Sequence, residues 1–206
     1  MTAKRKYEQR LRAERQDETR RRITEATAAL HQEIGPAQTT ISAIAERAGV
    51  ERLTVYRHFP DEGELLQACQ QHFRAQHPLP DPALWADMSD PAERLRMALV
   101  ALYAYYRDTE AMTANILHDA PLMPGLAAIL AGRNAYFVAL HAALASDWSV
   151  AGKAQELLSA AIGHALDFET WRSLARRQRL SDEQAVTLML QLATSLVGDA
   201  AAMSQA

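Results

Sequence analysis

Two short helical patterns that meet at Gly49 constrain the fold of this chain more than any other feature. Residues 41–48 place small apolar side chains on one face of a two-turn helix, and Thr40 stands where the N-cap of that helix is expected. Gly49 can adopt the left-handed backbone that ends a helix, and Val50 follows it with an apolar side chain that can enter the core. The pattern predicts a tight helix-turn-helix arrangement.

The second helical pattern begins near Glu51 or Arg52 and is rich in hydrogen-bonding side chains. Val55 and Phe59 are expected to point inward, and the exposed side is expected to carry Arg52, Leu53, Thr54, Arg57 and His58. Arginine can donate two hydrogen bonds to guanine, a threonine methyl group can contact thymine, and tyrosine and histidine can hold phosphates. This helix is therefore predicted to read DNA in the major groove. The alternative is an ordinary helical hairpin with a solvated polar face.

Helical spacing of apolar residues runs through the rest of the chain and strand signals are nearly absent, so the predicted fold class is all-α. The first helix is expected to end at Gly35-Pro36, and the three prolines of segment 77–82 predict a linker between two domains. Beyond the linker, helices are expected from Asp90, over 110–118, 126–145 and 150–177, and from a capping box at Ser181 and Gln184 to about Met203.

The net charge of −3 hides an asymmetry between the two ends of the chain. Residues 1–60 carry 12 Lys and Arg against 8 Asp and Glu, a net charge of +4, and residues 61–206 carry 10 against 17, a net charge of −7. A basic N-terminal part ahead of an acidic remainder indicates that only one end meets a polyanion.

The single cysteine, Cys69, excludes an intramolecular disulfide and a cysteine-cluster metal site. The first 22 residues lack the apolar stretch of a signal peptide, and no run approaches the roughly 18 apolar residues of a membrane helix. We therefore expect a cytoplasmic protein with no membrane partner, no metal and no cofactor.

The residues around Gly49 closely resemble the N-terminal domain of TetR-type (TetR/AcrR) transcriptional regulators. The specific part of the match is the pattern A-x-R-A-G-V followed by Y-x-H-F, and the likeness covers about residues 17–75. It implies a helix-turn-helix DNA-binding domain over 17–76 behind a basic arm over 1–16, and an effector-binding and dimerisation domain over 83–206. It also implies a homodimeric repressor that a small-molecule ligand releases from a palindromic operator in double-stranded DNA.

The resemblance implies a role for each position of the turn. Thr40 corresponds to the phosphate-binding cap of the first of the two short helices, Tyr56 and His58 lie toward the DNA backbone, and the base-facing positions are Arg52, Leu53, Thr54 and Arg57. Two positions depart from the family, because Glu51 replaces a Ser-type cap and Glu62 stands near a position that is commonly Lys. The candidates to replace that lost phosphate contact are the basic residues of the arm, Lys4, Arg5, Lys6, Arg10, Arg12 and Arg15; the alternative is a frayed tail.

The C-terminal half has two helical stretches, around 157–168 and 186–197, that are apolar on more than one face. Such helices must be covered on both sides, which supports a homodimer through the last two helices. Polar and aromatic residues inside the apolar helices are the candidates for an effector pocket: Tyr103, Tyr106, Asn115, His118, Asn134, Phe137, His141, His164, Phe168 and Trp171. No Arg or Lys cluster lies among them, which favours a largely hydrophobic effector of modest size.

Other functions fit the same residues less well. An activator, or a regulator that needs no ligand, would share the same DNA-binding end. An all-α enzyme could use His118-Asp119, or His164 with Asp167, as acid–base or metal pairs. The chain has no HExxH, GxSxG, CxxC or Gly-rich phosphate loop to support that class.

Overall fold

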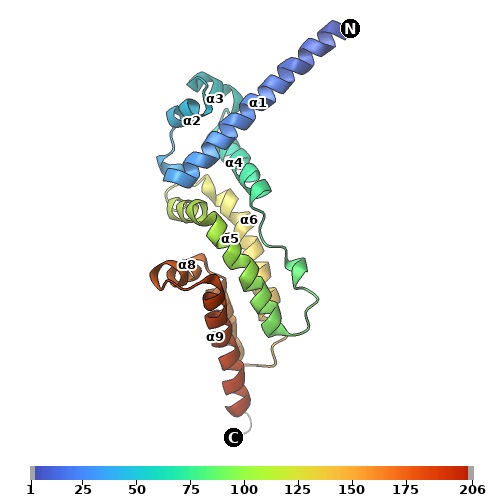
Figure 1. Cartoon of the computed structure of the whole chain (residues 1–206), viewed down its shortest axis with the longest axis vertical. Coiled ribbons are helices and arrows are strands. Elements are labelled where there is room, and N and C mark those ends of the chain that lie inside the picture. The colour runs from blue at the N-terminus through green and yellow to red at the C-terminus, as the bar shows by residue number, and fades with distance from the viewer. Residues whose placement is uncertain (1–2, 204–206) are drawn as a thin grey trace. The chain divides into compact units, whose positions relative to one another are not determined.

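The fold is all-α, as the sequence predicts. The computed structural model describes the backbone of residues 3–203 and the side chains of residues 5–198, and no strand occurs in that part. By its contacts the chain divides into two compact units (Figure 1), the first of residues 1–78 with 110–130 and the second of residues 79–109 with 131–206. Residues 110–130 thus group with the N-terminal helices, whereas the predicted domains, 17–76 and 83–206, divide the chain only at the linker.

The first unit is built on a long helix, α1 (Ala3–Ile34), followed by the short η1 turn (Pro36–Gln38), α2 (Ile41–Ala48), α3 (Arg52–His58) and α4 (Glu62–Gln76). One stripe of α1 packs against α2 and α4. The core of this unit consists of small and branched side chains that are at most 6 % exposed: Ile23, Ala26, Leu30, Ile44, Ala45, Ala48, Val55, Phe59 and Leu65. The alanines allow the short helices to approach α1 closely, so the four helices share one small core.

The turns of this unit have the predicted chemistry. Gly49 has φ 64 and ψ 42, and its N–H donates to the carbonyls at the end of α2. The hydroxyl of Thr40 accepts from the N–H of Ala43 at 3.1 Å, which caps the start of α2. Glu51 stands at the N-cap of α3 but makes no capping hydrogen bond through its side chain. Asp61 caps α4 by accepting from the N–H of Glu64 at 2.9 Å.

The end of α5 (Pro91–Asp119) contacts the end of α1 within the first unit. Asn115 donates through Nδ2 to the carbonyls of His31 at 2.9 Å and Gln32 at 3.0 Å, in the last turn of α1. The carbonyl of His31 also accepts from the N–H of Gly35 at 3.1 Å. A carboxylate oxygen of Asp119, a buried residue, accepts from the N–H of Ala37 in η1 at 2.8 Å. Residues about 80 positions apart are therefore joined by hydrogen bonds, a connection that no local pattern indicates.

His31 is a buried titratable group of this unit, with 4 % of its surface exposed. Its Nδ1 lies 3.5 Å from Sγ of Cys69. Burial lowers the pKa of His31 to about 4, against an opposing effect of the Asp119 charge, and burial raises the pKa of the Cys69 thiol to about 12. Both groups are therefore neutral at pH 7 and act as small parts of the core.

The second unit contains the first 19 residues of α5 together with most of α6 (Leu126–Ala145), and then α7 (Lys153–Leu166), α8 (Phe168–Arg172) and α9 (Asp182–Met203). A short turn η2 (Pro82–Leu84) precedes α5, and a π-helical turn η3 (Ser173–Arg177) follows α8. Helices α7 and α9 pack along each other. The buried side of this pair is apolar and includes Leu158, Ile162, Ala165, Leu166, Ala185, Val186, Met189 and Ala193.

Two of the expected helix boundaries are wrong. The stretch 110–118 is not a separate helix but the last part of α5, because no Gly or Pro interrupts residues 92–119. The stretch 150–177 is not one helix, because Asp167 ends α7 and caps α8 by accepting from the N–H groups of Glu169 at 2.7 Å and Thr170 at 3.3 Å.

The capping box before α9 is confirmed. The N–H of Ser181 donates to Oε1 of Gln184 at 2.9 Å, and the N–H of Gln184 donates to Oγ of Ser181 at 3.2 Å. Helix α6 differs from the expectation that no segment is long and apolar enough to span a membrane, since by length and composition alone it could do so. A single helix that passes this test is weak evidence for a membrane span.

The left-handed residue of the turn provides a test of the fold. A Cβ at position 49 would lie 2.8 Å from Nη2 of Arg22 and would hold an L-residue at positive φ. We expect Gly49→Ala to lower the free energy of unfolding by about 1–2 kcal/mol in urea titration. Gly198→Ala is the matched control, because its Cβ would meet nothing within 4 Å inside α9, and it should leave stability unchanged or raise it. Equal stability of Gly49→Ala and the wild type would show that the turn does not need glycine.

The buried His31 predicts a pH dependence of stability. Its folded pKa of about 4 lies below the ordinary value of 6.5, so the unfolded chain binds the proton more tightly. The contribution of neutral His31 to the free energy of unfolding is complete above pH 6.5 and is lost as pH falls toward 4. The loss is up to about 3 kcal/mol, at 1.36 kcal/mol per pH unit. Urea titrations at pH 7, 5.5 and 4.5 should show this loss in the wild type and in His72→Gln, a partly exposed control, but a smaller loss in His31→Gln. If the free energy of unfolding of His31→Gln fell with pH as steeply as that of the wild type, His31 would not be the source of the pH dependence.

Candidate nucleic-acid interface

Helix α3 presents most of the predicted DNA-contacting side chains to solvent. Arg52, Leu53, Tyr56 and Arg57 are exposed, with Leu53 at 55 % and Tyr56 at 47 %, and Thr54 and His58 are partly buried. Val55 and Phe59 are buried in the core, at 0 % and 3 % exposure. Large apolar and aromatic side chains are thus held outward on a seven-residue helix, beside two arginines.

Two arginines of α1 hold the turn before α3 and the last residue of α3 in place. Arg22 donates from Nη2 to the carbonyl of Ala48, the last residue of α2, and to the carbonyl of Gly49 at 3.3 Å in the turn that precedes α3. Arg20 donates from Nη1 to the carbonyl of His58, the last residue of α3, and its guanidinium lies 4.0 Å from the ring centroid of Phe59. A guanidinium over an aromatic ring is favourable. Both cations therefore fix the backbone of the turn and of α3.

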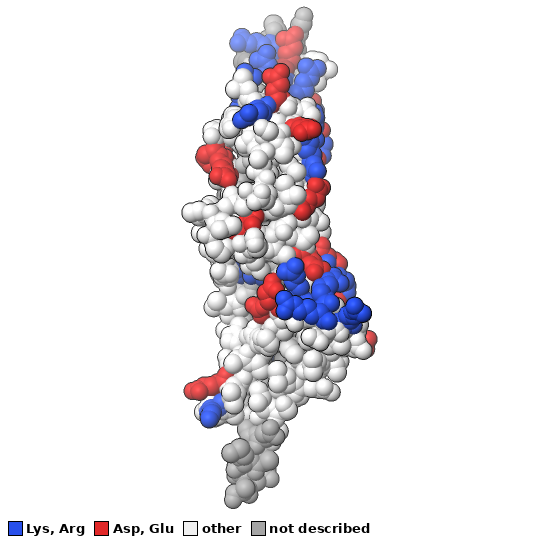
Figure 2. Space-filling model, turned by 90° about the vertical axis from the view of Figure 1, so that its left-hand side faces the viewer, with Lys and Arg blue, Asp and Glu red and all other residues white. Residues whose placement is uncertain are grey.

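Many of the basic side chains near the N-terminus are paired with acidic ones. Arg10 contacts Glu14 at 2.7 Å, Arg21 contacts both Glu18 and Glu25, and Arg47 contacts Glu33 through both terminal nitrogens at 2.6 and 2.7 Å. Hydrogen bonds from Arg47 lower the pKa of Glu33. Figure 2 shows positive and negative side chains interspersed along α1. The net positive charge of this part of the chain is therefore carried by the basic side chains that have no acidic partner.

Arg52 and Arg57 differ from these arginines, because neither has an acidic partner among the residues that the structure describes. Their guanidinium groups are exposed on the same short helix. The predicted arm, 1–16, is helical from Ala3 onward and continues directly into α1. Residues 1 and 2 of the arm, and the side chain of Lys4, lie outside the described residues.

The structure brings five of the ten effector candidates into one aromatic cluster of the second unit. Tyr106 lies at the centre, with ring centroids at 6.5 Å from Tyr103, 6.3 Å from Phe137, 5.3 Å from Phe168 and 5.8 Å from Trp171. All except Phe137 are at most 2 % exposed. The cluster joins α5, α6 and α8.

The hydroxyl groups of the two tyrosines are already used inside this cluster. Tyr103 donates to the carbonyl of Ala165 at 2.9 Å, and Tyr106 donates to the carbonyl of Leu166 at 2.6 Å. These carbonyls belong to the last turn of α7, where a helix leaves acceptors unpaired. Burial raises the pKa of both phenols well above the ordinary range, so both remain donors. The rings line the cluster while the hydroxyls join α5 to α7.

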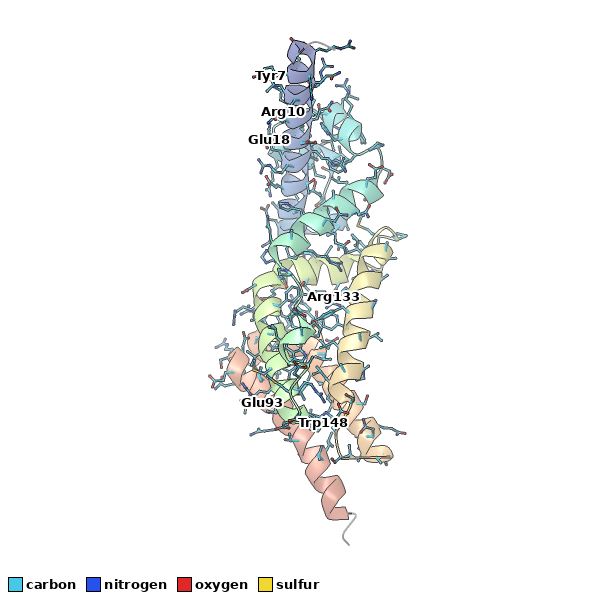
Figure 3. The ribbon with its side chains drawn as sticks, turned by 90° about the vertical axis from the view of Figure 1, so that its right-hand side faces the viewer. Tyr7, Arg10, Glu18, Glu93, Arg133 and Trp148 are labelled. Carbon is cyan, nitrogen blue, oxygen red and sulfur yellow. The ribbon has the colours of Figure 1, made fainter. Side chains whose placement is uncertain are left out.

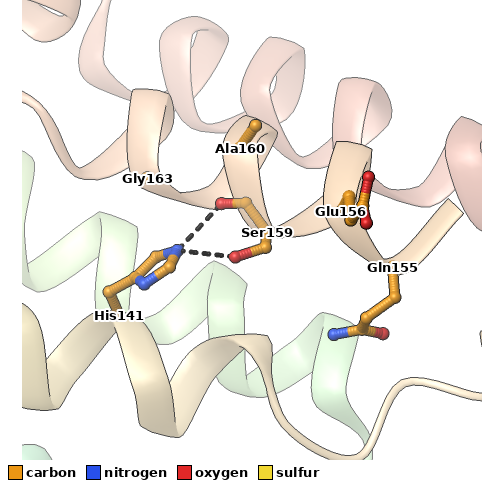
Figure 4. A pocket seen from close by; sticks show the side chains of 6 residues that line it. All are labelled: His141, Gln155, Glu156, Ser159, Ala160 and Gly163. Atoms are coloured by element: carbon orange, nitrogen blue, oxygen red, sulfur yellow. Dashed lines mark hydrogen bonds between the residues drawn. The ribbon is translucent and has the colours of Figure 1, made fainter. Parts of the chain in front are cut away.

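The other candidates lie apart from the cluster. Asn115 and His118 belong to the first unit, where Asn115 caps α1 and the largely exposed His118 contacts Asp119 at 2.8 Å. Asn134 and His164 are exposed in the second unit. His141 lines an open hollow between α6 and α7 (Figure 4), where its Nε2 lies 2.8 Å from the carbonyl oxygen of Ser159 and 3.2 Å from its hydroxyl.

Sequence reasoning missed three arginines that the structure places at these sites. Arg20 and Arg22 appear in the sequence only as members of a mixed charged run, and their backbone acceptors are 38 and 26 residues away. Arg133 lies over the ring of Phe137 at 4.5 Å. Arg133 could have been singled out from the sequence as a candidate site residue, because it is the single charged residue of the segment 126–145.

Comparison with known proteins agrees with this geometry. Residues 23–69 match the family model described as bacterial regulatory proteins, tetR family. An uncharacterised HTH-type transcriptional regulator of Mycobacterium tuberculosis is 32 % identical over 123 residues, a match that covers 59 % of this chain and 59 % of the length of that relative.

Two solved structures are similar over most of their length. A TetR-like transcriptional regulator from Rhodococcus sp. RHA1 aligns with a TM-score of 0.62 and 19 % identity, over 85 % of this chain and 93 % of that one. AibR, crystallised with isovaleryl coenzyme A and operator DNA, aligns with a TM-score of 0.63 and 21 % identity, over 84 % and 97 %. At these identities the likeness shows the fold alone. The family match covers residues 23–69, and the likeness to the curated relative and to the solved structures extends the resemblance to TetR-type transcriptional regulators beyond that segment.

Proposed function

We propose that the protein is a homodimeric repressor that binds a palindromic operator and is released from it by a small-molecule ligand. The observation that carries this proposal is the outer face of α3, where two arginines without acidic partners stand beside Tyr56 and Leu53. Residues of α1 hold the last residue of this helix and the turn before it. A helix of this kind fits the major groove, and its arginines can each fork onto O6 and N7 of a guanine.

Within each half-site, the roles differ by position. Arg52, Leu53, Thr54 and Arg57 are the proposed base-facing residues, and Tyr56 and His58 are proposed to contact phosphates, with Thr40 at the start of α2. Glu62 lies in the first turn of α4 and cannot attract a phosphate, so the phosphate contact expected at the start of this helix must come from elsewhere. The exposed basic residues of the predicted arm are the proposed source.

Exposed apolar residues on α7 and α9 support the dimer. Leu157, Leu188 and Leu192 have 49 %, 43 % and 42 % of their surface exposed, although the opposite faces of the same helices are buried. On the face shown in Figure 2, the lower part of the second unit carries few charged side chains. A second copy that packs the same two helices against these leucines would bury them in a symmetric four-helix interface.

The ligand-responsive part of the proposal rests on the aromatic cluster around Tyr106, which combines a large apolar surface with few polar groups. In the solved structure of AibR, that protein is bound both to isovaleryl coenzyme A and to operator DNA. A TetR-type chain of the same fold can therefore hold an acyl compound. We propose that this protein acts in the cytoplasm in the same general way, on an effector of its own.

Footprinting on the upstream region of the protein's own gene tests the whole proposal. A protected palindrome that is lost on addition of a compound is the expected result. Protection that no compound removes would favour a ligand-independent regulator, and increased transcription from the bound site would favour an activator. Absence of any protected sequence would contradict the proposed function.

The two arginines of α3 give the sharpest prediction for DNA. We expect Arg57→Ala and Arg52→Ala each to relax base preference at one position per half-site and to weaken specific binding by about 1–3 kcal/mol. Tyr56→Phe should weaken binding to all sequences about equally. Binding to a library of mutated operators measures both effects. Arg74→Ala, an exposed arginine near the end of α4, is the control. Wild-type specificity in both α3 variants would exclude this helix as the reader.

The leucines of α7 and α9 give the prediction for assembly. Leu192→Glu would place an unpaired charge inside the proposed interface, at a cost of about 3–5 kcal/mol, and should produce monomers in sedimentation velocity with a corresponding loss of operator affinity. Leu84→Glu is the matched control, since Leu84 is 66 % exposed outside these helices, and it should stay dimeric. A folded dimer of the double variant Leu188→Glu and Leu192→Glu would show that the interface lies elsewhere.

A further inference from the structure

Helix α6 has an unusual distribution of polarity. Its exposed side in the second unit is made of small, mostly apolar residues together with one amide: Ala131, Gly132, Asn134, Ala135, Val138, Ala139, Ala142 and Ala143. Arg133, the single charged residue of the helix, is on the other side, in register with Phe137, Leu140 and Leu144. Surface helices ordinarily place charge outward and apolar residues inward. Here the charge is turned inward.

The guanidinium of Arg133 lies against the aromatic cluster. Its Cζ is 4.5 Å from the ring centroid of Phe137, whose ring is stacked at 6.3 Å on that of Tyr106. The positive charge opposes the effect of burial on the pKa of Tyr106, which places the guanidinium within electrostatic reach of that phenol. Figure 3 shows Arg133 on the side of α6 that faces α5.

Arg133 also lacks the acidic partner that nearby arginines have. The three arginines of α5 each contact a carboxylate: Arg94 with Asp147 at 3.0 Å, Arg96 with Glu93 at 2.5 Å, and Arg107 with Asp182. Within the second unit, no acidic side chain in the described residues lies at ion-pair distance from Arg133. A half-buried cation without a counter-ion is unfavourable, and contact with one aromatic ring offsets only part of that cost.

We propose that Arg133 is the anion-binding residue of an effector site, which takes the carboxylate of an aromatic or aliphatic acid and places its apolar body against Phe137 and Tyr106. This inference rests on the proposed ligand-responsive function. The hydroxyls of Tyr103 and Tyr106 already donate to backbone carbonyls, so the guanidinium is the free hydrogen-bond donor identified beside these rings. A single arginine matches a single carboxylate in charge and in its two parallel donors. A polyphosphate group would require several cations.

A fluorescent aromatic sulfonate, 8-anilinonaphthalene-1-sulfonate, tests the site without any knowledge of the natural effector. Its sulfonate stands in for the carboxylate, and the neutral N-phenyl-1-naphthylamine has nearly the same aromatic body. We expect Arg133→Gln to bind the sulfonate about 10- to 100-fold more weakly, the effect of one lost charge-assisted hydrogen bond, and to bind the neutral probe as the wild type does. Arg177→Gln, an exposed arginine of the same unit, is the matched control and should bind both probes normally.

Displacement of the sulfonate then identifies the chemical class. In the wild type, 4-phenylbutyrate and decanoate should displace the probe at least 10-fold better than their amides, and this preference should disappear in Arg133→Gln. Equal displacement by acid and amide would overturn the proposal, as would a wild type that does not bind the sulfonate or an Arg133→Gln variant that binds it normally. Displacement by isovaleryl coenzyme A but by neither acid would assign the site to a phosphate compound and would also overturn it.

Thermal unfolding without any ligand separates a binding role from a structural one. If Arg133 holds the fold, Arg133→Gln should melt at a lower temperature than the wild type, and the proposal fails. If it holds an anion, the melting temperature should be unchanged or higher, because an unpaired cation has been removed. These measurements contain no DNA. Arg133-dependent binding of acids that leaves operator protection unchanged would support the site and contradict ligand release.

Discussion

The position of α3 depends on two arginines that reach it from α1. Arg22 holds the carbonyl of Ala48 before the helix, and Arg20 holds the carbonyl of His58 at its end while covering Phe59. A seven-residue helix is too short to be stable alone, so these contacts and the burial of Val55 define its direction. With the backbone held from behind, Arg52 and Arg57 remain available on the outer face.

The local parts of this arrangement could be predicted from the sequence, and the long-range parts could not. Gly49, Thr40 and the inward direction of Val55 follow from turn chemistry and from a period of 3.6 residues, which act over a few positions. The hydrogen bonds of Arg20 and Asn115 join residues 38 and 84 positions apart. Their partners are backbone carbonyls, which have no residue type and therefore leave no pattern in a sequence.

The same distinction applies to the second unit. The two-sided apolar character of α7 and α9 is visible in the sequence and corresponds to exposed Leu157 and Leu192 opposite a buried face. The sequence did not indicate that one helix ends and another begins at Asp167. Apolar residues continue at helical spacing on both sides of it, and an aspartate within such a pattern is typical of an exposed helix position. Aromatic residues could be named as pocket candidates from their polarity and spacing. Only three-dimensional placement separates the Tyr106 cluster from Asn134 and His164, which are exposed.

In the proposed function, helix α5 is the element through which an effector would act. It is one uninterrupted helix whose earlier part carries Tyr103 and Tyr106 in the second unit and whose end carries Asn115 and Asp119 in the first. The residues beside the aromatic cluster and those that cap α1 therefore belong to the same helix. A ligand shifts DNA binding only by its different affinity for two arrangements of the protein. A 100-fold loss of operator affinity requires a difference of about 2.7 kcal/mol. Asn115 and Asp119 make three hydrogen bonds with α1 and η1. At about 1 kcal/mol each, their combined free energy is of the size of the required difference.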